Sequence, residues 1–135
     1  LPMTVLETLL EWDGCDGVIM LGIMGRRILL NRMTDAVKQV DPSYTHASLD
    51  KAVAELAHWE ARYIIRIVQL MERLGKPIVG VNLLTDSRDV TVRRVEGHNL
   101  KAVFYETPEQ AVKVLAHMVA YQKFRSRQLN HPAPV

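Results

Sequence analysis

Three short apolar segments constrain the fold of this chain more than any other feature. Residues 18–23 are apolar apart from Gly22, and turn residues flank them on both sides. Segments 78–84 and 102–105 have the same character. Strands that are apolar on both faces are typical of parallel sheets covered by helices. Because helical patterns lie between the segments, we predict a three-layer α/β domain with a mainly parallel sheet, in which these strands are parallel neighbours.

The two ends of the chain carry helix-capping patterns. Thr4 and Glu7 have capping-box spacing and predict a first helix over residues 5–12. Thr107 is a suitable N-cap for a last helix that reaches about residue 125, with a proline at the next position. Residues 90–95 alternate only partly between apolar and polar, so a short edge strand and an irregular loop are equally compatible with them.

The middle of the chain predicts an unusually long helix. From Leu49 to Leu74, apolar residues recur at alternating steps of four and three, except that Glu60 takes an expected apolar position. This helix would be roughly 40 Å long at 1.5 Å per residue. With a helix over residues 28–40 it forms a long α-hairpin insertion. Helix 48–74 is either an extended core helix or a surface for a partner or a second copy, since near-heptad patterns pair helices.

Composition excludes several classes of protein. The 135 residues are 48% hydrophobic and 24% charged, and 17 basic residues against 15 acidic ones give a net charge of +2 without a basic cluster. We therefore expect no nucleic-acid partner. No apolar run approaches the roughly 20 residues that span a bilayer, so we expect no membrane partner. The lone Cys15 indicates a reducing compartment, and we predict a cytoplasmic protein.

The sequence begins at Leu1 and has no signal-peptide pattern. We expect a single domain over residues 1–125, excised from a longer chain, followed by a flexible tail over 126–135. The common catalytic motifs of α/β proteins are missing: no Gly-x-Gly-x-x-Gly, no phosphate-binding P-loop, no metal-binding carboxylates after the first strand and no zinc-ligand spacing. We therefore predict no catalytic residue and no metal ligand.

A candidate ligand site lies where the parallel strands end. Ligands of open parallel sheets bind beyond the carboxyl ends of the strands. The loops expected there contain flexible backbone amides, hydroxyl groups and guanidinium groups, a combination that suits an anion such as phosphate. The candidate residues are Gly22, Gly25, Arg26, Arg27, Thr85 and Ser87. An equally acceptable interpretation makes Arg26 and Arg27 solvated residues at the start of the α-hairpin.

An ordered set of short motifs points to a known family. The motifs are Gly75-Lys76-Pro77 before the second strand, Thr107-Pro108-Glu109 at the start of the last helix, Ala111-Val112 within it, and Tyr121-Gln-Lys-Phe124 near its end. The chain resembles the succinyl-CoA-synthetase-like flavodoxin-fold domain of NDP-forming acyl-CoA synthetases, which include ADP-forming acetate–CoA ligase. His98 follows a glycine as the phosphorylated histidine of that family does, but the glycine-rich surroundings are missing.

The resemblance implies a flavodoxin-like, non-autonomous domain of a nucleotide-dependent acid–thiol ligase. The domain would contribute loops to the ligase site and would assemble with CoA-binding and nucleotide-grasp domains of the parent protein. CoA and ATP or ADP with Mg²⁺ would belong to the parent enzyme, and we expect no cofactor on this domain and no activity of the isolated chain. The alternative is a non-catalytic flavodoxin-like interaction or regulatory module.

Overall fold

The chain forms an α/β domain around a four-stranded open sheet with the strand order β1-β2-β4-β3. The computed structural model describes residues 2–22, 24–41, 43, 46–82 and 91–130. The strands are β1 (Val18–Leu21), β2 (Ile78–Val81), β3 (Val92–Arg94) and β4 (Lys101–Tyr105). Strands β1, β2 and β4 are parallel, and β3 is antiparallel to β4. The predicted parallel neighbours are therefore confirmed, and residues 92–94 form the short edge strand.

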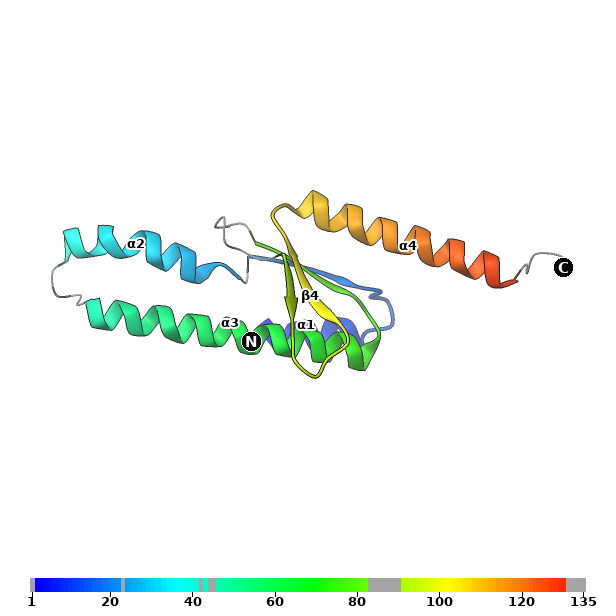
Figure 1. The fold of residues 1–135 in the computed structure, drawn as a ribbon, viewed down its shortest axis with the longest axis horizontal. Helices are drawn as coiled ribbons and strands as arrows, with labels where there is room; N and C mark the ends of the chain where they lie inside the picture. The colour runs from blue at the N-terminus through cyan, green and yellow to red at the C-terminus, as the bar shows by residue number, and fades with distance from the viewer. Residues whose placement is uncertain (1, 23, 42, 44–45, 83–90, 131–135) are drawn as a thin grey trace.

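Helices cover both faces of the sheet (Figure 1). Helices α1 (Pro2–Glu11) and α3 (His46–Leu74) pack on one face, and α4 (Pro108–Asn130) packs on the other. The larger core lies under α1 and α3, where Leu10, Ile67 and Leu70 are almost fully buried. A smaller cluster under α4 contains Val79, Val81 and Ala111. The arrangement is three layers, as the doubly apolar strands require.

The long α-hairpin is also present. Helix α2 (Arg26–Val40) packs against α3, and the two project together beyond the carboxyl edge of the sheet (Figure 1). The 29 residues of α3 span about 44 Å at 1.5 Å per residue. Its second half supplies the buried Tyr63, Ile67 and Met71 to the core beneath the sheet. Its first half lies alongside α2, so both halves of the apolar stripe contact other elements of the chain.

The predicted start of the first helix is wrong. Helix α1 begins at Pro2, and Thr4 lies inside it, where its carbonyl oxygen accepts a 2.9 Å hydrogen bond from the Thr8 hydroxyl. Proline is well suited to the first helical turn, because no intrahelical partner exists for an N–H there. Thr4 and Glu7 are therefore interior residues of α1 rather than a capping box.

The observed ends of the strands and of the last helix also differ from the predicted ends. Strand β1 ends at Leu21, because Gly22 has a φ of 65° and leaves the extended conformation. Strand β2 ends at Val81, and residues 83 and 84 of the predicted strand lie outside the described residues. Helix α4 continues to Asn130, so residues 126–130 of the predicted tail are helical, and residues 131–135 lie outside the described part.

The predicted N-cap of α4 is confirmed in its main feature. The Thr107 hydroxyl accepts a 3.3 Å hydrogen bond from the Gln110 backbone N–H. The Gln110 side chain accepts a 3.2 Å bond from the N–H of Glu106, one residue before the position that a standard capping box uses. Two donors at the entrance of the helix are thereby satisfied.

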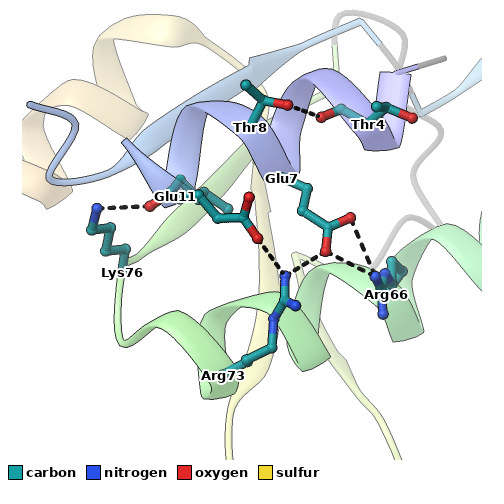
Figure 2. A network of polar contacts seen from close by, with 8 residues as sticks. Thr4, Glu7, Thr8, Glu11, Arg66, Arg73 and Lys76 are labelled. Atoms are coloured by element: carbon teal, nitrogen blue, oxygen red, sulfur yellow. Dashed lines mark hydrogen bonds and ion pairs between the residues drawn. The ribbon is translucent and has the colours of Figure 1, made fainter. Parts of the chain in front are cut away.

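A charged cluster fixes α1 against α3 (Figure 2). Glu7 forms ion pairs with Arg66 and Arg73 of α3, and Arg73 also reaches Glu11 at 3.3 Å. The hydrogen bond from Arg73 is the main reason that the pKa of Glu7 lies below its ordinary value. Lys76, after the end of α3, donates hydrogen bonds to carbonyl oxygens at the end of α1. One flank of α1 is therefore held against α3.

Candidate functional site

The carboxyl ends of the three parallel strands meet at one edge of the sheet. The N–H of Gly22 donates a 3.2 Å hydrogen bond to the carbonyl oxygen of Val81. The N–H of Asn82 donates a 2.8 Å bond to the carbonyl oxygen of Tyr105. The loop after β1 therefore starts beside the end of β2, which in turn lies beside the end of β4. This edge is where open parallel sheets bind ligands.

Gly25 connects this loop to α2. Its φ of 89° lies in the left-handed region, which suits glycine, and it is the N-cap of α2 with no side chain to satisfy the first turn. A carboxylate from α3 contacts this position: Oε1 of Glu60 accepts a 3.0 Å hydrogen bond from the Gly25 N–H. A negative charge at a helix N-terminus is favourable because of the helix dipole. The Glu60 carboxylate therefore supplies a negative charge at the N-terminus of α2 from within the protein.

The remaining donors of this helix end come from Arg26 and Arg27, the first two residues of α2. Their backbone N–H groups have no partner within the helix, because the first turn lacks preceding carbonyl groups. Their side chains are outside the described structure, as are Thr85 and Ser87. Of the predicted site, the structure thus brings together Gly22, Gly25 and the start of α2, and it leaves the contributions of the second loop untested.

Two buried polar groups lie in the same part of the domain. Asn82 is 6% exposed and Tyr63 is 3% exposed, yet neither the Oδ1 atom of Asn82 nor the Tyr63 hydroxyl has a hydrogen-bond partner among the residues that the structure describes. Burial raises the pKa of Tyr63, whose ring lies 5.0 Å from that of Trp59. Buried polar groups are almost always hydrogen-bonded.

The sequence contained a signal for two of the three residues that were not assigned to the site, Glu60 and Asn82. Glu60 interrupts the apolar stripe of the long helix, and its position is now explained by the hydrogen bond to Gly25. Asn82 is the one polar residue of an apolar strand segment. Tyr63 lies on the same stripe as the core residues and gave no separate signal. Contacts between residues 35 positions apart, such as Gly25 and Glu60, are not readable from local patterns.

His98 lies away from this site, at the amino edge of the sheet. Its Nδ1 atom is 2.6 Å from Oε2 of Glu72 on α3. Oε1 of Glu72 accepts hydrogen bonds from the backbone N–H groups of Asn99 and Leu100, at 2.8 and 3.1 Å. The His98 side chain thus belongs to a carboxylate-centred clamp on the turn between β3 and β4. This geometry indicates a structural role for His98.

An apolar cavity of about 340 Å³ lies on the α4 side of the sheet, near the same amino edge. Pro77, Val79, Val103 and Met118 are among its lining residues. Within the described residues, no three His, Cys, Asp or Glu side chains are grouped to hold a metal ion. No helix in the described part of the chain is long and apolar enough to cross a membrane.

No family model, curated protein or solved structure matches the chain.

Proposed function

We propose that this chain is a non-autonomous, flavodoxin-like domain of an NDP-forming acyl-CoA synthetase, which supplies one wall of the ligase site. The observation that carries the proposal is the carboxyl edge of the sheet. There the N-terminus of α2 has no side-chain N-cap, and the Oδ1 atom of Asn82, buried at the end of β2, has no hydrogen-bond partner in the described part of the chain. The ordered motifs around residues 75–77 and 107–124 support the family assignment.

In this proposal the carboxyl edge of the domain binds an anionic group and does not itself form or break bonds. Backbone N–H groups at a helix start, together with the helix dipole, favour phosphate and carboxylate groups. Ligase reactions of this type pass through acyl phosphates, so a phosphoryl group held at the start of α2 would be positioned for reaction. Under this proposal CoA, the nucleotide and Mg²⁺ bind to other domains of the parent protein, and His98 accepts no phosphoryl group.

Glu60 gives the proposal a sharp test. Its carboxylate competes with an incoming anion for the positive end of α2, because it already accepts the Gly25 N–H. Glu60→Gln keeps an acceptor oxygen of the same shape and removes the charge. We expect this variant to bind inorganic phosphate roughly five- to thirtyfold more tightly, since nearby charges at a protein surface interact by about 1–2 kcal/mol.

The affinity would be measured by NMR titration of the full chain with inorganic phosphate, and separately with CoA. Arg26→Ala/Arg27→Ala should weaken binding, whereas the exposed Lys113→Ala on α4 is the matched control and should leave it unchanged. Equal affinities for the wild type, Glu60→Gln and Arg26→Ala/Arg27→Ala would contradict anion binding at the start of α2.

A second candidate, the non-catalytic interaction module, is favoured by the outer half of α4. This part of the helix projects beyond the sheet (Figure 1) and exposes Val119, Tyr121, Phe124 and Leu129, which are 53–75% accessible. Exposed apolar groups in such number are typical of a surface that contacts another protein. Binding of neither phosphate nor CoA to any variant would favour this module over the ligase domain.

A further inference from the structure

The sheet ends abruptly at β1. Strand β1 pairs with β2 on one side, and in the described residues no strand lies on its other side. The N–H groups of Val18 and Gly22 point toward β2, where they bond to the carbonyl oxygens of Pro77 and Val81. Alternate residues of a strand direct their N–H groups to opposite sides. The N–H groups of Ile19 and Leu21 therefore point toward the open edge.

This edge strand is short, with four residues, but it lacks the charge and the proline that normally prevent strand pairing. Native proteins protect edge strands with charged side chains, prolines or bulges. The opposite edge follows that rule, because β3 is only three residues long and contains Arg93 and Arg94. Strand β1, in contrast, is Val-Ile-Met-Leu, without a charge or a proline. It has the composition of a strand from the interior of a sheet.

Helix α1 extends the apolar surface on one side of this edge. Its Glu7 and Glu11 face α3 (Figure 2). Its Leu6 and Leu10 belong to the larger core cluster. The remaining flank lies away from α3, beside β1, against which α1 also packs. Helical periodicity of 3.6 residues per turn places Val5 and Leu9 on that flank. Trp12 follows the last residue of α1, and its ring lies against Gly14 in the turn before β1. The side chains of Val5, Leu9 and Trp12 are 55%, 41% and 63% exposed.

Helix α4 extends the apolar surface on the other side of the β1 edge. Val114 and Met118 line the cavity that faces β4. By the same periodicity, Val112 and Val119 lie on the opposite flank, toward β1, and are 56% and 53% exposed. Leu21 of β1, between the two helices, is 54% exposed. We call this surface the β1 edge face; it consists of Val5, Leu9, Trp12, Leu21, Val112 and Val119.

We infer that the β1 edge face is covered by a second copy of this chain, related by a two-fold axis perpendicular to the sheet. This axis pairs β1 antiparallel with its equivalent, so that the outward N–H groups of both copies find carbonyl partners. It also brings like layers together, α1 against α1 and α4 against α4, and joins two four-stranded sheets into one of eight strands. Closed two-fold dimers are the commonest form of homo-oligomer.

Charge favours a second copy over a charged partner. The six residues of the β1 edge face include no ionisable side chain, so contacts among these residues in a two-fold arrangement bring no like charges together. The acidic residues of α1 that lie nearby are already paired with Arg66 and Arg73 on the far flank. A face without charge resembles the interior of a domain, which is the character of permanent homodimer interfaces.

The test combines sedimentation equilibrium with amide hydrogen exchange on the full chain. We expect a dimer, and we expect exchange at Ile19 and Leu21 to slow as the protein concentration rises. The N–H groups of Val18 and Gly22, which are bonded to the β2 side, should be protected at every concentration. A wild-type chain that is monomeric across the concentration range used for NMR would overturn the inference.

Matched variants locate the interface. Leu9→Lys on the β1 edge face should give a monomer, whereas Leu29→Lys on α2, with a similar exposure of 45% against 41%, should remain a dimer. If Leu9→Lys fails to fold by circular dichroism, Val5→Lys serves in its place, because Val5 is more exposed. Dissociation by Leu29→Lys but not by the α1 variants would place the contact on the α2–α3 hairpin and overturn the inference.

Discussion

Gly80 shows how a single missing side chain shapes the core. It lies in the middle of β2, and a Cβ atom there would overlap the ring of Phe104 on β4. Phe104 is 4% exposed and belongs to the larger core cluster, so its ring has little freedom to move. The glycine is therefore needed for the close approach of this aromatic ring.

Gly80→Ala should lower the free energy of unfolding by about 1–3 kcal/mol, the usual cost of overpacking a core. Urea denaturation would measure it. In the Phe104→Leu background the smaller side chain leaves room, so the same substitution should cost less there. Equal costs in the two backgrounds would show that contact with Phe104 is not the reason for glycine at this position.

Glu72 makes the stability of the domain dependent on pH. The hydrogen bond with His98 and the backbone N–H groups of Leu100 and Asn99 hold the pKa of Glu72 below its ordinary value. A carboxyl group with a depressed folded-state pKa stabilises the protein above the unfolded-state pKa. This contribution is lost as the pH falls through the folded-state pKa.

Glu72→Gln should therefore lower the melting temperature at neutral pH and reduce the loss of stability between neutral and acidic pH. Thermal unfolding followed at several pH values would measure both effects. Glu96→Gln, an exposed glutamate in the turn before His98, is the control and should change neither. An unchanged acid profile in Glu72→Gln would show that the clamp makes no contribution to stability.

At the scale of elements, the entrance of α4 depends on Thr107. Its hydroxyl is the acceptor for the Gln110 N–H, so the side chain satisfies a donor that the helix itself leaves unpaired. Thr107→Ala should destabilise the domain by about 1 kcal/mol, as is usual for loss of an N-cap. Thr107→Ser keeps the hydroxyl and should retain most of the stability in the same urea titration. Equal losses in both variants would contradict the capping role.

The elements were predictable wherever their pattern is local. The apolar segments gave the parallel strands because burial on both faces leaves no polar alternation, and Thr107 with Pro108 gave the start of α4. Element ends were less predictable, since Gly22 ends β1 through its φ of 65° and Thr4 lies inside α1. The loop after β1, with Gly22 and Gly25, could be predicted as part of the candidate site. The contact of Glu60 with Gly25 was not, because it depends on the packing of two distant segments.

At the scale of the whole molecule, three different sides of the domain are assigned to three tasks. The carboxyl edge holds the proposed anion site at the start of α2. The amino edge carries the Glu72–His98 clamp, which fixes the turn between β3 and β4. The β1 edge face is the proposed dimer contact. These regions do not share residues, although Leu21 of the β1 edge face directly precedes Gly22 of the anion site.

The most direct test of the central claim is the location of the bound anion. Inorganic phosphate titrated into the full ¹⁵N-labelled chain should shift the amides of Gly22, Gly25, Arg26 and Arg27 first, because they surround the start of α2. The amides of Asn99 and Leu100, at the opposite edge, serve as the internal control and should stay in place. Shifts confined to that opposite edge would contradict an anion-binding wall at the carboxyl end of the sheet.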